Sequence, residues 1–160
     1  MVLVSALLVG MSLHSRLKKR RDFLHEMLVF ISLIKIEFEF MSLTVLQVLR
    51  KIQSTGSCRN LDFINDCIKS INAGDDFSSA WHNAVSLSRL PMKKEEREKL
   101  ADFGNLVGTS DIKGQLSLLS LFYESFLAYG KKADEDFEKY GKLCITVSII
   151  VGTGIFIFII

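Results

Sequence analysis

The chain has 160 residues, of which 49% are hydrophobic, and a single proline, Pro91. This length allows one modest domain, and the near absence of proline favours a helical fold. The 20 basic and 18 acidic residues give a net charge of +2. That charge is too close to neutral to suggest a protein that binds nucleic acid.

The opening segment, MVLVSALLVGMSL, is uncharged and would form a helix about 20 Å long, short for a hydrocarbon core of about 30 Å. Five basic residues follow it: Arg16, Lys18, Lys19, Arg20 and Arg21. A secretory signal peptide would carry its positive charge before the apolar segment, not after it. We therefore expect residues 1–13 to form an N-terminal membrane segment, with the basic cluster on the cytoplasmic side. How completely this segment crosses the bilayer is left open.

Residues 24–41 carry apolar side chains around most of a helical surface, which is typical of a central or partnered helix. Ser42 is a candidate N-cap for a second helix over residues 45–52. Whether the chain breaks near residue 42 is left open. The run STGS, residues 54–57, ends the second helix.

Three further helices are expected in the middle of the chain. The first covers residues 61–71, and Asp75 or Asp76 is the candidate N-cap of the second, which extends to Leu87. After Pro91, the charged run KKEEREK begins the third helix. We interpret this run as a solvated helix face, and the alternative is a docking surface for another protein.

Residues 111–160 are expected to form one long helix, because no proline interrupts them and because LVGTSD combines a helix stop with a helix start. Residues 143–160 carry no charge and would span about 27 Å as a helix, close to the thickness of the hydrocarbon core. Lys139 and Lys142 precede them, as basic residues do on the cytoplasmic side of a membrane helix. The sequence thus predicts a C-terminal transmembrane helix.

These elements predict an all-α fold, an antiparallel bundle of about six helices with membrane helices at both termini. Residues 1–13 would be the N-terminal membrane segment and residues 143–160 the C-terminal transmembrane helix. Residues 14–142 between them would form a cytoplasmic helical bundle domain.

No catalytic or cofactor-binding pattern is found in the sequence. His25 is followed by Glu26 but lacks the second histidine of a zinc-protease helix. Cys58 and Cys67 lack the C-x-x-C spacing of metal and redox sites, and GKL at Gly141 lacks the upstream glycine of a P-loop. We expect no enzymatic activity, no metal and no cofactor, and we expect the cysteines to be reduced thiols.

A pattern of aromatic, glycine and polar residues marks the second half of the chain, W…L-x-x-F-G-x-x-L/V-G-x-S-D-x-x-x-Q. Its members are Trp81, Phe103, Gly104, Gly108, Ser110, Asp111 and Gln115. Together with the long helix and the glycine-bearing apolar end that follow, this pattern resembles the stage III sporulation protein AB family of endospore-forming bacteria. The resemblance covers nearly the whole chain.

The resemblance implies a cytoplasmic helical domain similar to the F-type platform proteins of type II secretion machines. It also implies a place in the channel complex that joins mother cell and forespore, at the outer forespore membrane with the domain in the mother-cell cytoplasm. The implied partners are the family's ATPase, stage III sporulation protein AA, and other stage III sporulation channel proteins. The implied role is that of a non-enzymatic platform subunit that docks the cytoplasmic ATPase.

The motif can also be explained by structure alone, as a helical corner. Phe103 would fill the core between the last two helices, and Gly104 would allow a close helix crossing. Gly108 would reverse the chain direction, and Ser110 or Asp111 would cap the last helix. Gln115 would make a side-chain hydrogen bond across the turn.

Two other functions are weighed against the platform. The first is a tail-anchored coiled-coil tether that homo-oligomerises through residues 111–142, where apolar residues recur at spacings of three and four. The aromatic character of that stripe disfavours a coiled coil. The second, a membrane-bound hydrolase using His25 or His82, has no supporting motif.

Overall fold

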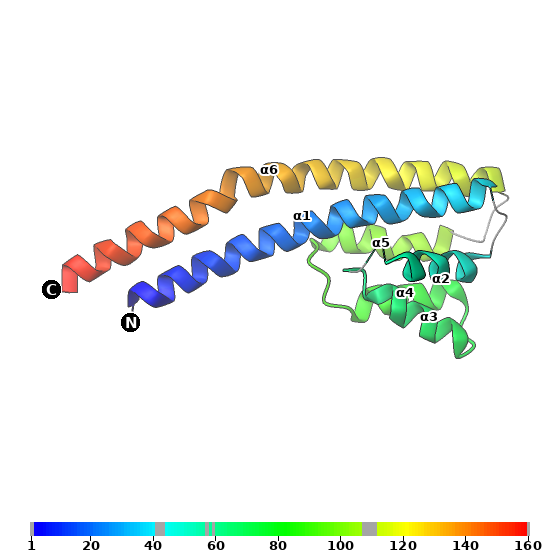
Figure 1. Cartoon of the computed structure of the whole chain (residues 1–160), viewed down its shortest axis with the longest axis horizontal. Helices are drawn as coiled ribbons and strands as arrows, with labels where there is room; N and C mark the ends of the chain where they lie inside the picture. The colour runs from blue at the N-terminus through cyan, green and yellow to red at the C-terminus, as the bar shows by residue number, and fades with distance from the viewer. Residues whose placement is uncertain (1, 41–43, 57, 59, 107–111, 160) are drawn as a thin grey trace. The chain divides into compact units, whose positions relative to one another are not determined.

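The computed structural model describes residues 2–40, 44–56, 58, 60–106 and 112–159. Within these ranges the structure describes every side chain except those of residues 2–7, 106, 112, 113, 142, 144, 145, 148, 149 and 151–159. The secondary structure of these ranges consists of helices (Figure 1): α1 (Val2–Phe40), α2 (Val45–Thr55), α3 (Phe63–Asn72), α4 (Phe77–Leu87), α5 (Lys94–Leu106) and α6 (Ile112–Ile159). The predicted all-α fold of about six helices is confirmed.

The chain divides into two compact units. One consists of Met1–Asp22 and Gly130–Ile160, and we call it the terminal helix pair. The other consists of Phe23–Tyr129, and we call it the bundle unit. The boundaries expected from charge, after residues 13 and 142, concern membrane insertion and stay a prediction.

The two outer helices are long and uninterrupted. The single helix expected over residues 111–160 is confirmed by α6, which has 48 residues, and α1 continues through the basic cluster for 39 residues. Within the part of the chain that the structure describes, no helix is both long enough and apolar enough to cross a membrane. The spans expected at residues 1–13 and 143–160 fall mostly on side chains outside the described ones and stay predictions.

The N-cap of helix α2 is Thr44, so the prediction of Ser42 as its cap is wrong. The Thr44 Oγ1 accepts a hydrogen bond from the Gln47 backbone N–H at 3.4 Å, and the Gln47 side chain accepts one from the Thr44 N–H at 2.9 Å. This reciprocal box needs a glutamine or glutamate three residues after the cap, and that spacing selects Thr44. Ser42 itself lies outside the described residues. Gly56, with φ of 65°, ends the helix.

Helix α4 begins at Asp76, one of its two expected caps. The Asp76 carboxylate accepts a hydrogen bond from the Ser79 backbone N–H at 3.0 Å. That bond lowers the pKa of Asp76, because it stabilises the charged form.

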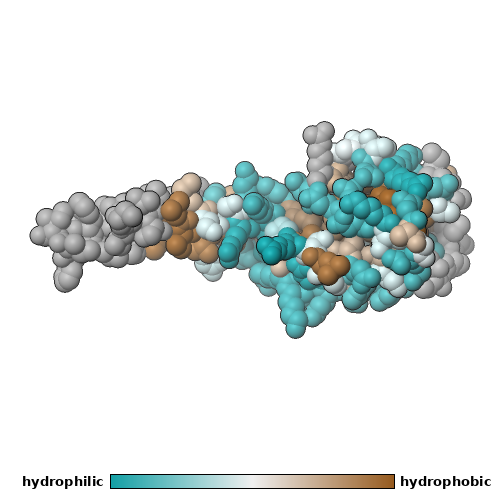
Figure 2. Space-filling view, turned by 90° about the horizontal axis from the view of Figure 1, so that it is seen from below, coloured by the Kyte–Doolittle hydropathy of each residue, from teal (hydrophilic) through white to brown (hydrophobic). Residues whose placement is uncertain are grey.

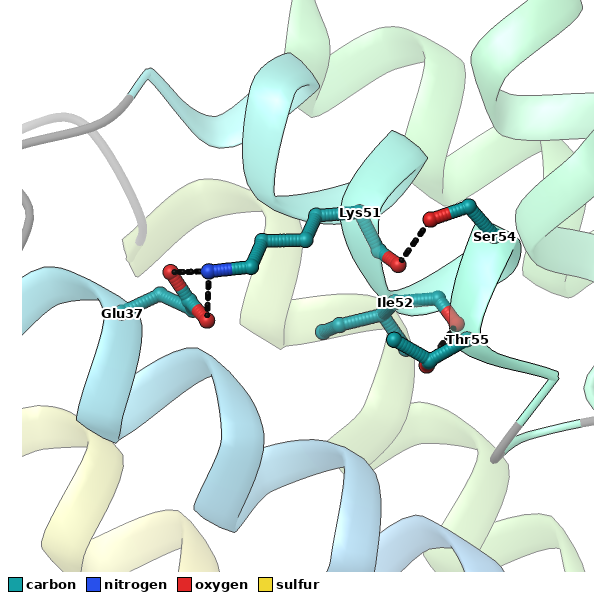
Figure 3. A network of polar contacts seen from close by, with 5 residues as sticks. All are labelled: Glu37, Lys51, Ile52, Ser54 and Thr55. Atoms are coloured by element: carbon teal, nitrogen blue, oxygen red, sulfur yellow. Dashed lines mark hydrogen bonds and ion pairs between the residues drawn. The ribbon is translucent and has the colours of Figure 1, made fainter.

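An ion pair ties α2 to α1 (Figure 3). The Lys51 ammonium lies 2.7 and 2.9 Å from the two carboxylate oxygens of Glu37, whose side chain is largely buried. On the next turn of α2, the Ser54 hydroxyl donates to the Lys51 carbonyl at 2.8 Å. Lys51 thus joins α2 to α1.

The charged run that opens α5 is only partly a solvated face. Glu96 is 1% exposed, and its carboxylate accepts a hydrogen bond from the Lys93 backbone N–H at 2.8 Å, which caps the helix. The Arg97 guanidinium donates to the carbonyls of Val85 at 2.9 Å and Ser88 at 2.6 Å. It thereby satisfies carbonyls that the end of α4 leaves without helical partners.

The core of the bundle unit is built around Trp81, which is fully buried. Its ring centroid lies 5.9 Å from that of Phe30 on α1, 5.2 Å from Phe63 on α3 and 4.9 Å from Phe103 on α5. The indole N–H donates to the Leu100 carbonyl at 2.7 Å. One residue therefore joins four helices with its only polar atom satisfied.

Gly104 faces the same tryptophan across the α4–α5 contact. A Cβ built on Gly104 would lie 2.9 Å from both Cβ and Cδ1 of Trp81. Real Cβ atoms do not approach each other this closely, so the absence of a side chain is what permits the helices to pack at this distance.

We expect Gly104→Ala to destabilise the protein by about 1–2 kcal/mol, because overpacking against Trp81 outweighs the gain in helix propensity. Thermal unfolding of the full chain, followed by circular dichroism, measures the change. Gly141→Ala is the matched control, since a Cβ there would meet nothing closer than 3.4 Å and should not destabilise. An unchanged midpoint for Gly104→Ala would contradict the steric argument.

Candidate functional site

The structure describes part of the sequence motif and places that part in the core. Trp81, Phe103 and Gly104 are buried together, as described above. Gln115 is half-buried on α6. The remaining members lie outside the described residues: Gly108, Ser110 and Asp111. Trp81, Phe103 and Gly104 thus act in helix packing.

The histidines expected to matter for a hydrolase are dispersed. His25 lies on α1 and His82 on α4, and both are exposed. His14 is half-buried and takes part in a helix contact described below. Throughout the described ranges, no group of three or more His, Cys, Asp and Glu side chains is placed to hold a metal ion.

A small hollow of about 210 Å³ lies between the end of α2 and the start of α3. Its lining includes Ile52, Leu61, Ile64 and the half-buried Cys58. Burial, and to a lesser degree the Glu26 carboxylate, raises the pKa of the Cys58 thiol to about 11. The thiol is therefore protonated at neutral pH and is a weak nucleophile there.

Cys67 is fully buried on α3, and burial raises the pKa of its thiol to about 12. Both described cysteines thus behave as small apolar side chains. The side chain of Cys144 lies outside the described ones.

Charged side chains meet in the terminal helix pair, where α1 and α6 lie antiparallel (Figure 1). The Arg20 guanidinium on α1 donates to the Asp136 carboxylate on α6 at 2.9 Å, and the two side chains are 9% and 24% exposed. The Arg21 guanidinium lies 4.3 Å from the centroid of the Phe137 ring. Two members of the basic cluster are therefore used to pair the helices.

His14 makes a second contact between these helices, nearer the chain ends. Its Nδ1 lies 2.9 Å from the Gly141 carbonyl oxygen, and its ring centroid lies 5.2 Å from that of Phe137. A histidine nitrogen can donate to a carbonyl only when protonated, so this contact assigns the proton to Nδ1.

These contacts set the register of the pair. Arg20 lies level with Asp136, and His14 lies level with Gly141. Because the helices are antiparallel and rise equally per residue, the uncharged segments of both begin at the same level. Large apolar residues are exposed from that level toward the chain ends: Leu8, Val9, Met11, Leu13, Leu143, Val147 and Ile150. Figure 2 shows this apolar band beside the grey atoms of the chain ends.

Next to this apolar band, on the side away from the chain ends, four cations are exposed to solvent. We call them the basic collar: Arg16, Lys18, Lys19 and Lys139. In the register above, Lys139 of α6 lies level with Arg16 of α1. The five basic residues of α1 cannot be told apart from the sequence alone, whereas the structure turns two of them inward and three outward. The partner of Arg20 is 116 residues away, so no local signal could identify it. The side chain of Lys142 lies outside the described ones.

Comparison with known proteins identifies one family. The family model described as stage III sporulation protein AB matches residues 1–160, the whole chain. No curated protein and no solved structure gives a significant match.

We expect Asp136→Asn to destabilise the helix pairing by about 2 kcal/mol, because it removes a carboxylate that pairs with the buried Arg20. The double change Arg20→Met with Asp136→Leu should recover most of the loss, since both charges of this ion pair are then replaced by apolar side chains. Thermal unfolding of the full chain measures both effects. Glu135→Gln, at an exposed neighbouring position, is the control, and an equal effect of the two single changes would refute the role of the ion pair.

We expect Cys58 to react slowly with iodoacetamide at pH 8, because a thiol with a pKa of about 11 is thiolate in about one molecule per thousand at that pH. Glu26→Gln removes a negative charge that raises this pKa and should speed the reaction. Peptide mass spectrometry follows each cysteine separately. Cys67, whose pKa is raised by burial, is the internal control. Equal rates at Cys58 with and without Glu26 would oppose the electrostatic explanation.

Proposed function

The chain belongs to the stage III sporulation protein AB family, and on that premise we propose that it is a membrane-anchored, non-enzymatic platform subunit of a stage III sporulation complex. Its two ends insert in the membrane, and the helical part between them holds a cytoplasmic ATPase beside the channel apparatus. The ATPase is stage III sporulation protein AA.

The observation that carries this proposal is the position of the two uncharged segments. The uncharged segment of α1 and that of α6 begin at the same height along the helix pair. The contact between His14 and Gly141 brings the starts of both uncharged segments together. An antiparallel pair that becomes apolar at one level matches the geometry of two helices entering a bilayer side by side. Exposed apolar residues on both helices, such as Leu8 and Ile150, support the same interpretation.

The distribution of basic residues supports an orientation. The collar and the paired arginines lie on the inner side of both uncharged segments, and basic residues flanking membrane helices stay in the cytoplasm. On this proposal the helical domain lies in the cytoplasm. The family, and not the charge pattern, is the reason for proposing the mother-cell cytoplasm for the domain and the outer forespore membrane for its anchors.

Exposed apolar side chains on the bundle unit support a protein partner. Phe40 is 75% exposed and Leu87 is 85% exposed, and apolar side chains of this size are available for contact with a protein partner. Anchoring at two points confines this surface to a thin layer beside the membrane. Confinement raises the effective concentration of the domain for partners that are also at the membrane.

The coiled-coil tether is less well supported. Its seam would use the apolar side of residues 119–140, but Leu119, Phe122 and Phe126 are buried within the chain itself. Phe122 and Phe126 belong to the aromatic core, with Phe122 5.2 Å from Phe103. A second copy could reach this side only if the chain opened.

We expect the full-length protein, solubilised in detergent from sporulating cells, to co-purify with stage III sporulation protein AA. Deletion of residues 143–160 should lower that recovery by about tenfold or more, because the membrane no longer concentrates the domain. Replacing the same residues by an unrelated apolar helix is the matched control and should preserve recovery. If the intact protein brings down neither the ATPase nor any other complex component, the platform function is wrong.

A further inference from the structure

We propose that the basic collar, formed by Arg16, Lys18, Lys19 and Lys139, is a binding site for the headgroups of anionic phospholipids. The inference rests on the membrane anchoring proposed above and adds a lipid class to it. Both helices of the terminal helix pair contribute, because the register places Lys139 level with Arg16.

The depth of the collar fits the headgroup layer. If the uncharged segments begin at the edge of the hydrocarbon core, near His14, then Arg16 lies about 3 Å and Lys19 about 8 Å beyond that edge along the helix. The headgroup region on each side of a bilayer is about 5–8 Å thick. The cations therefore lie at the height of lipid phosphates, and their long side chains can reach them.

The collar cations are exposed, and within the described part of the chain Arg16, Lys18 and Lys19 form no ion pair. The next two basic residues differ sharply. Arg20 is paired with Asp136, and Arg21 bonds to Asp22. The protein thus neutralises the cations farther from the border and leaves those nearest the border for another partner.

The local charge favours an anionic rather than a zwitterionic headgroup. Over residues 16–19 of α1 and 135–139 of α6, the exposed carboxylates are those of Glu135 and Glu138. They are fewer than the four cations of the collar. The excess of positive charge is attracted to a net negative headgroup, whereas a choline group offsets the charge of its own phosphate. The collar therefore distinguishes phosphatidylglycerol from phosphatidylcholine.

The test uses the full chain reconstituted in phosphatidylcholine vesicles with trace spin-labelled lipid, either phosphatidylglycerol or phosphatidylcholine. Electron paramagnetic resonance measures the fraction of each label that the protein immobilises. We expect the protein to prefer phosphatidylglycerol over phosphatidylcholine by about fivefold. This factor corresponds to the attraction of one basic residue to an anionic surface. Added salt should weaken the preference, because it screens exposed charges.

The variant carries Arg16→Gln, Lys18→Gln and Lys19→Gln and should lose most of the preference. The matched control changes three exposed cations of the bundle unit, Lys69→Gln, Arg89→Gln and Lys94→Gln, and should keep it. Both triple variants alter the net charge equally, so an equal loss in the two would overturn the site.

Alkaline carbonate extraction of the same vesicles separates the two proposals. A protein that resists extraction but immobilises both lipids equally would leave the anchoring intact and refute the lipid site, with an acidic protein partner then the better candidate for the collar. A protein that carbonate removes would refute the anchoring, and the lipid site with it.

Discussion

The pairing of α1 with α6 in the terminal helix pair is the constraint on which the functional interpretation depends. The contacts that set the register of these two antiparallel helices include the ion pair between Arg20 and Asp136 and the hydrogen bond between His14 and Gly141. A shift of one helical turn would move one uncharged segment about 5 Å past the other. The matched level of the two apolar segments therefore follows from these polar contacts.

The energetics of that pairing favour specificity over stability. A buried arginine–carboxylate pair loses much of its Coulombic attraction to desolvation, whereas an unpaired buried charge is strongly unfavourable. Arg20 and Asp136 therefore disfavour registers that would separate these two side chains. Arg21 adds a cation–π contact with Phe137, which is compatible with the same register. The result is one helix pair that presents its other cations, among them Lys18, to the surroundings.

In the bundle unit, the main interaction is the close packing of helices around one tryptophan, Trp81. Trp81 supplies a large apolar surface to four helices and satisfies its own N–H on Leu100. Gly104 provides the space that this ring needs. The motif that reveals the family in the sequence is, as far as it is described, a packing motif.

Local features of the sequence were sufficient for a fold of about six helices and for the uninterrupted α6, and they narrowed the cap of α4 to Asp75 or Asp76. Caps, turns and periodicity act over a few neighbouring residues. The choice of Thr44 over Ser42 also had a local signal, in Gln47. Tertiary structure alone decided that Glu96 is buried and that Arg20 faces inward while Lys18 faces outward. Those outcomes depend on residues that are far apart in the sequence and become neighbours only on folding. No local pattern of the sequence identifies such neighbours.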